Sequence, residues 1–248
     1  MANWSDPRPT ASAFGASVPG TRGTTYDAGL RKYMLSVYNY MASGVLLTGI
    51  VALLFASGGR ESLAAQVFLT PGPLKYIIMF SPLAFVMVLS FGINRLSTGT
   101  AQLLFWAFAG IMGLSMSTIF LVYTGSSIAT TFFATAFAFL SLSIYGYTTK
   151  RNLQAFGTFL IMGVVGLIVA SLLNLWMQSS ALQMGISAIG VLLFAGLTAY
   201  DTQRIKEMYA HVAGTDMMGK AVIMGALSLY LDFINMFQFL LSFLGNRE

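Results

Sequence analysis

The chain contains 248 residues, of which 56% are hydrophobic and only 8% are charged. Soluble domains are roughly 45–50% apolar and about 25% charged, so this composition excludes an ordinary soluble protein. The sequence has no cysteine and one histidine, which excludes disulfides, thiolate metal sites and cysteine nucleophiles. The net charge of +5 comes from basic residues that occur singly or in pairs, a pattern that does not favour nucleic-acid binding.

Seven apolar segments are each long enough to cross a membrane as a helix, which takes about 20 mostly apolar residues. None of them alternates between polar and apolar residues as the strands of a membrane barrel do. The predicted fold class is therefore an all-α integral membrane protein with seven transmembrane helices. We expect these helices at residues 33–57, 75–95, 102–123, 128–148, 156–177, 181–203 and 220–244.

The first 30 residues differ from the rest of the chain. They are rich in Ser, Thr, Gly, Pro and Ala and contain no long apolar run. This composition is typical of a flexible polar tail. A cleaved signal peptide would contain an apolar segment, and these residues have none. We expect two parts, a tail at 1–30 and a seven-helix membrane domain at 31–248.

The basic residues predict the orientation. Counted along seven alternating spans, ten Lys and Arg residues fall on the side of the N-terminus and three on the other. Positive charge marks the cytoplasmic side, so we expect a cytoplasmic N-terminus and an external C-terminus. The three residues on the external side are Arg60, Lys75 and Arg247.

Two of the eight acidic residues, Asp201 and Asp232, fall within predicted spans. A carboxylate at the membrane centre costs about 3 kcal/mol on insertion scales, which indicates a partner or a use. Both lie in the inner halves of consecutive helices joined by a predicted loop of residues 204–219. Two carboxyls in contact would share a proton and could titrate near cellular pH. The alternative is two separate acids, Asp201 beside Arg204 and Asp232 bonded to a neighbouring hydroxyl.

Three further polar residues are candidates for the same site. Arg95 ends the second span on the cytoplasmic side and could close over the acids as a latch, although an interfacial anchor is the alternative. Ser228 and Asn235 lie about one helical turn before and after Asp232, where they could line a polar seam or bond to neighbouring helices. His211 falls in a predicted exposed loop, and we assign it no role.

Two segments resemble the paired signature of the Bax inhibitor-1 family, also called the transmembrane Bax inhibitor motif family. They are Ala-Tyr-Asp-Thr-Gln-Arg-Ile-Lys at 199–206 and Ala-Leu-Ser-Leu-Tyr-Leu-Asp-Phe-Ile-Asn at 226–235. The resemblance is to a bacterial-type member. It implies a central seventh helix wrapped by two layers of three helices. It also implies that Asp201 and Asp232 form a pH-sensing di-aspartyl pair in a passive, pH-dependent calcium leak, with Arg95 at the position of the family's latch arginine.

The expected partners are the lipid bilayer, a calcium ion bound weakly and transiently at Asp201 and Asp232, and other membrane proteins, with no nucleic acid. We expect no resident metal or cofactor, and the bacterial inner membrane as the location. The alternative function is a non-transporting regulator that binds a quality-control protease or a respiratory assembly. An intramembrane aspartyl protease, and with it an enzyme, is disfavoured because the residues before Asp232 contain no Gly-x-Gly.

Overall fold

A computed structural model describes the backbone of residues 19–247 and the side chains of residues 26–247. Seven of its helices are long and apolar enough to cross a membrane, which confirms the predicted fold class. The described elements are α1 (Pro19–Ala56), η1 (Gly59–Glu61), α2 (Leu63–Phe68), α3 (Leu74–Gly92), α4 (Thr98–Met116), α5 (Ile119–Val122), α6 (Gly125–Thr148), α7 (Gln154–Met177), α8 (Ser180–Val212) and α9 (Met218–Leu244).

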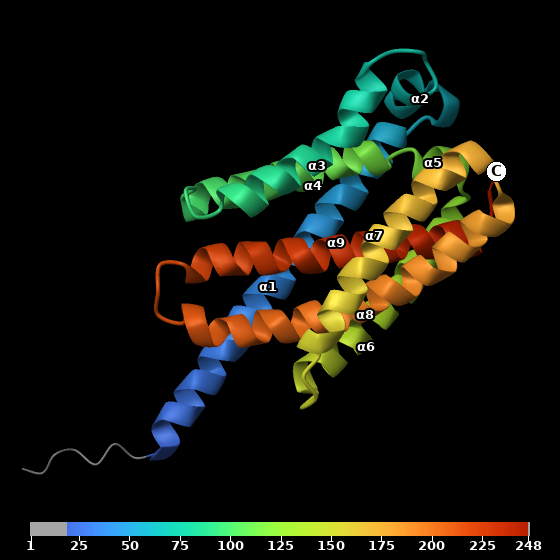
Figure 1. The fold of residues 1–248 in the computed structure, drawn as a ribbon. Helices are drawn as coiled ribbons and strands as arrows, with labels where there is room; N and C mark the ends of the chain where they lie inside the picture. Colours follow the sequence, from blue (N-terminus) through green and yellow to red (C-terminus); the bar gives the residue numbers. More distant parts are fainter. Residues whose placement is uncertain (1–18, 248) are drawn as a thin grey trace, which may run out of the picture.

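Helix α9 lies at the centre of the bundle, as Figure 1 shows. It packs against α1 and α4 on one side and against α6 and α8 on the other. Helix α3 reaches this core through α4, and α7 reaches it through α8, so α1, α3 and α4 form one layer and α6, α7 and α8 the other. This arrangement agrees with the central helix and two layers that the family resemblance implied.

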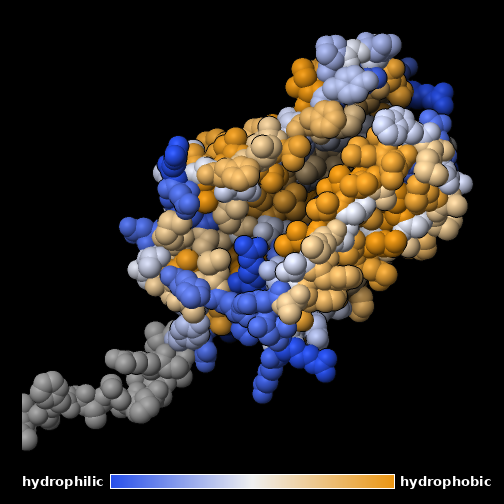
Figure 2. Space-filling view, viewed as in Figure 1, coloured by the Kyte–Doolittle hydropathy of each residue, from blue (hydrophilic) through white to orange (hydrophobic). Residues whose placement is uncertain are grey.

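The outer surface of the bundle is apolar. Large hydrophobic side chains face outward along most of the helices, and they form the extensive orange surface in Figure 2. Phe91, Phe137 and Trp176 are each more than three-quarters exposed. In water such a surface would drive aggregation, whereas in a bilayer it faces the acyl chains. The protein is therefore an integral membrane protein.

The sixth span is longer than the sequence predicted. Helix α8 continues nine residues past residue 203 to Val212, so the predicted loop of residues 204–219 is reduced to residues 213–217. Charged residues suggested a loop, but Ile205, Tyr209 and Val212 recur at helical spacing and are buried. The helix therefore continues as an amphipathic segment. His211 lies in its last turn, not in a loop.

The N-terminal boundary also differs from the expectation. Residues 1–18 lie outside the described part, and α1 already begins at Pro19, within the expected tail. Leu30, Tyr33, Met34 and Val37 are buried along one side of α1. The packed surface of α1 thus begins at Leu30, whereas Tyr26, Asp27 and Ala28 in the turn before it are exposed.

Helices α6 and α8 approach each other closely at Gly146. A Cβ atom at this position would collide with the backbone of Ala199 on α8. The missing side chain of Gly146 thus lets the two helix backbones approach closely, as is common inside membranes. One turn away, the hydroxyls of Ser143 and Thr202 lie 3.3 Å apart and join the same two helices. This contact sets the position of the α8 segment that carries Asp201.

Candidate functional site

Asp232 lies inside the bundle on α9 and is only 4% exposed. Its Oδ2 atom is one of two buried side-chain polar atoms without a hydrogen-bond partner among the described residues. Native proteins pair nearly all such atoms, because an unpaired buried polar group costs about 1–3 kcal/mol. An acid kept there at that cost indicates a functional role.

Asp201 approaches the same region from α8. Its side chain is partly buried, and it lies near enough for its charge to act on Asp232 on one side and for the charge of Arg204 to act on it on the other. The structure thus brings the two predicted acids together across the interface of α8 and α9. Whether their carboxyls share a proton stays a prediction.

The residues next to Asp201 are occupied with structural contacts on the other side of α8. Gln203 accepts a hydrogen bond from the Leu153 backbone at 2.8 Å and donates one to the Arg151 carbonyl at 2.9 Å. Lys206 donates to the Tyr147 carbonyl at 2.8 Å. These bonds hold the junction of α6 and α7 against α8. In the first signature segment, Gln203 and Lys206 therefore hold α8 to the junction of α6 and α7, while Asp201 faces α9.

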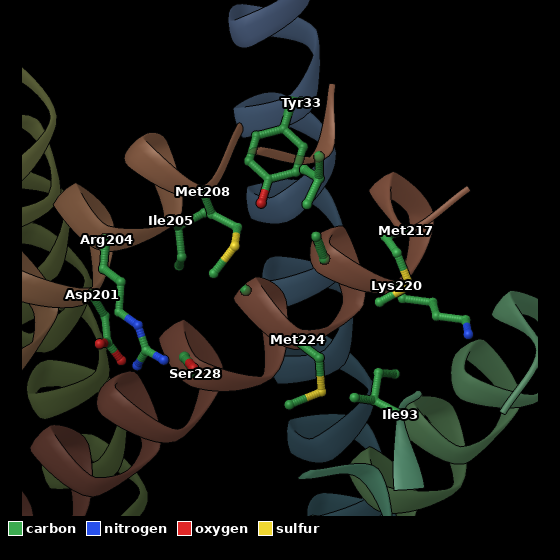
Figure 3. A pocket seen from close by; sticks show the side chains of 13 residues that line it. Tyr33, Ile93, Asp201, Arg204, Ile205, Met208, Met217, Lys220, Met224 and Ser228 are labelled. Atoms are coloured by element: carbon green, nitrogen blue, oxygen red, sulfur yellow. The ribbon is translucent and has the colours of Figure 1, made fainter. Parts of the chain in front are cut away.

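A cavity of about 220 Å³ lies at the basic end of the bundle, between α1, α8, α9 and the turn after α3 (Figure 3). Asp201, Arg204, Ile205, Met208 and Val212 line it from α8 at positions i, i+3, i+4, i+7 and i+11, which is one side of a helix. The opposite wall comes from α9. The cavity leads from the helix ends towards the two acids.

Ser228 and Asn235 lie on either side of Asp232 but face different spaces. Ser228 lines the cavity that contains Asp201, one helical turn before Asp232. Asn235 lines a separate pocket between α7, α8 and α9, and its amide donates to the Leu231 carbonyl of its own helix at 2.8 Å. Along α9, Asp232 therefore lies between the residues that line the two pockets and belongs to the lining of neither.

Arg95 does not line the cavity. It lies in the turn that follows α3 and is exposed, whereas Ile93, two residues earlier, contributes to the wall. The basic side chains of the cavity are Arg204 and Lys220, neither of which was predicted as part of the site. The spacing of Arg204, three residues after Asp201, was a signal for a shared helix side.

Tyr33 is a third residue of the cavity that was not predicted from the sequence. It lies on α1, is 1% exposed, and its hydroxyl points towards the cavity in Figure 3. That hydroxyl is the other buried polar atom without a partner among the described residues. No sequence signal identifies it, because a tyrosine in an apolar helix is ordinarily a core residue.

The acids supply few ligands for a metal ion. Within residues 19–247, no three His, Cys, Asp or Glu side chains come together. Carboxylate oxygens suit calcium, a hard cation, but calcium takes six to eight oxygen ligands. Two carboxyls fit a weak and transient contact better than a resident site.

Comparison of the sequence with known proteins identifies its family. Residues 30–248 match the sequence model of a family described as inhibitor of apoptosis-promoting Bax1. A Rickettsia prowazekii protein described only as uncharacterised is 49% identical over 229 residues, covering 92% of this chain and 95% of the relative. The inner membrane protein YbhL of Escherichia coli is 45% identical over 223 residues, covering 89% and 94% of the two chains. Both signature segments lie within the matched region, and we conclude that the chain belongs to the Bax inhibitor-1 family.

Proposed function

We propose that this protein is a pH-sensitive calcium leak channel in which Asp201 and Asp232 form the sensor. The observation that carries the proposal is the unpaired Oδ2 atom of Asp232 on the central helix, next to Asp201. An acid whose only purpose was to hold helices together would be fully hydrogen-bonded.

The chemistry follows from two carboxyls in one apolar interior. When they share a proton, the pair carries one negative charge and the helices can remain packed. Loss of that proton leaves two negative charges in a region of low dielectric constant. This change either attracts a divalent cation or separates α8 from α9, and both outcomes couple pH to permeation.

The pockets support a path that is interrupted at the acids. The cavity at the basic end reaches Asp201 and Ser228, and the pocket beside Asn235 begins one turn beyond Asp232. We propose that a movement of α9 against α8 connects them in the conducting state. Because Arg95 is exposed in its turn, the latch role requires that this turn close over the cavity in another state. In the present geometry, Arg204 is the base beside Asp201.

We also propose that the basic end faces the cytoplasm and that the protein resides in a bacterial inner membrane. Arg95, Lys150, Arg151 and Lys220 gather at that end of the bundle, in keeping with the positive-inside rule. The E. coli relative YbhL is an inner membrane protein, which supports the location.

Calcium flux into liposomes containing the purified protein, measured from pH 5 to pH 8, tests the proposal. We expect flux to depend on pH and Asp232→Asn to flatten that dependence, because an amide keeps the shape but does not titrate. Asp201→Asn should act similarly, and the double variant should add little, because coupled groups are not additive. Asp216→Asn, at an exposed site in the turn between α8 and α9, is the control and should keep the parent profile.

The competing function is a non-transporting regulator that binds other membrane proteins. It becomes the better explanation if the purified protein is folded and gives no calcium flux at any pH. The same holds if both aspartate variants conduct with the pH profile of the parent.

A further inference from the structure

We infer that the cavity between α1, α8, α9 and the turn after α3 binds the headgroup of an anionic phospholipid. The starting observation is Tyr33, whose hydroxyl points into this cavity without a hydrogen-bond partner although the residue is 1% exposed. The calcium leak makes no use of this hydroxyl. A buried donor aimed into a cavity is explained when a ligand accepts its proton.

The charges around the cavity favour an anion. Arg204 and Lys220 belong to the lining on opposite sides, and Figure 3 shows the Lys220 side chain running outward to the edge of the cavity. Asp201 is the one acid in the wall. Lys220 makes only a long 3.5 Å contact with the Asn94 carbonyl, which leaves most of its three donors free. A guanidinium and a phenol in the wall, with an ammonium at the outer edge, are donors that suit the phosphate diester of a headgroup.

The depth of the cavity fits the headgroup layer. It extends along α9 from Lys220, near the helix start, to Ser228, eight residues deeper. At 1.5 Å per residue this is about 12 Å, which covers the interfacial zone and the beginning of the hydrocarbon region.

The rest of the lining favours a lipid over a free phosphate. Most of the wall is apolar, and Met208, Met217 and Met224 contribute flexible side chains that adapt to an irregular ligand. A dissolved anion gains nothing from these contacts, whereas a phospholipid can place its glycerol and upper acyl chain against them. The lining therefore matches a ligand with one charged and one apolar part.

The test is direct binding to the purified full-length protein, measured by native mass spectrometry without calcium. We expect one tightly bound dioleoyl phosphatidylglycerol and no equivalent site for dioleoyl phosphatidylcholine, which has the same acyl chains. Tyr33→Phe and Lys220→Gln should each weaken that site about tenfold, the effect of losing one good charge-assisted hydrogen bond. Lys150→Gln removes an exposed charge at the same end of the bundle and should leave binding unchanged.

The competing outcomes are distinct. Equal binding of the two lipids, or parent-like binding by both Tyr33→Phe and Lys220→Gln, would overturn the site. An equal loss of binding in Lys150→Gln would show that the lipid is held by general surface charge and would overturn the site. Displacement of the lipid by millimolar inorganic phosphate would overturn the lipid as the ligand. If Lys220→Gln does not fold, Tyr33→Phe decides, because it removes a single oxygen. Calcium flux does not enter the readout, so the leak and the lipid site can fail independently.

Discussion

The hydroxyl oxygens of Thr48 and Tyr230 lie 2.6 Å apart in the interior of the bundle. Thr48 also donates to the Ala109 carbonyl at 2.8 Å. A hydroxyl has one proton to donate, so Tyr230 must be the donor to Thr48. This chain of two hydrogen bonds joins α9 to α1 and α4 two residues before Asp232.

Tyr230 lies at the start of this hydrogen-bond chain and Thr48 in its middle. Removing the Tyr230 hydroxyl and removing the Thr48 hydroxyl should therefore lower the stability by different amounts. Tyr230→Phe loses one hydrogen bond and should cost about 0.5–1.5 kcal/mol. Thr48→Val leaves the Tyr230 hydroxyl buried without a partner and should cost about 1–3 kcal/mol. Thermal unfolding of both variants in the same detergent gives the comparison. Equal stability of the two would contradict the assigned donor direction.

The close approach of α6 and α8 predicts that Gly146 tolerates no side chain. Gly146→Val should destabilise the protein by about 1–3 kcal/mol or more, because the atom in the way is the backbone of Ala199, which can move only if α8 shifts. Gly166 on α7 has open space around it and serves as the control. Gly166→Ala should be neutral or stabilise by up to about 1 kcal/mol. A similar loss of stability in both variants would show that the close approach of Ala199 is not the cause.

Gln203 should protect the junction between α6 and α7 from proteolysis. Gln203→Leu removes its bonds to Leu153 and Arg151 and should free the segment that carries Lys150 and Arg151. We expect trypsin to cut there several times faster than in the parent, as measured by the appearance of the N-terminal fragment. Gln154→Leu removes an exposed contact with Glu207 at the same junction and should change the rate little. An unchanged rate in Gln203→Leu would show that the junction is held by other contacts.

Asp232 should lower the stability of the protein. Asp232→Leu replaces an acid with an unpaired buried oxygen by an apolar side chain of similar size. We expect the variant to unfold at a higher temperature, with a gain of about 1–3 kcal/mol, while losing pH-dependent flux. Asp216→Leu, at an exposed position, should stay within about 0.5 kcal/mol of the parent. A destabilised Asp232→Leu would mean that the acid has a structural partner.

The orientation can be tested with single cysteines, because the chain has none of its own. Gly72→Cys lies in the exposed connection between α2 and α3, and Asn152→Cys lies in the exposed connection between α6 and α7. With a cytoplasmic N-terminus, a membrane-impermeant maleimide added to intact cells should label Gly72→Cys only. Labelling of Asn152→Cys before permeabilisation would reverse the topology.

The number of membrane helices and the presence of two acids among them could be predicted from the sequence alone. Both depend on local composition, since the cost of placing polar groups in hydrocarbon is counted segment by segment. The same local signal was wrong at residues 204–212, where charges suggested a loop. Ile205, Tyr209 and Val212 recur at helical spacing and are buried against the bundle. Their burial stabilises the helix even though the residues on its other side are charged.

The composition of the site was decided by tertiary packing. Arg95 and Arg204 are equivalent by charge and by their expected side of the membrane, and both are exposed, yet Arg204 lines the cavity and Arg95 does not. Tyr33 is more than 160 residues from Asp201 in the sequence and reaches the same cavity because α1 crosses α8 and α9 there. Hydropathy specifies which segments enter the membrane, but it contains no information on which sides of distant helices meet. That choice depends on the shapes of the packed side chains, which exist only in the folded bundle.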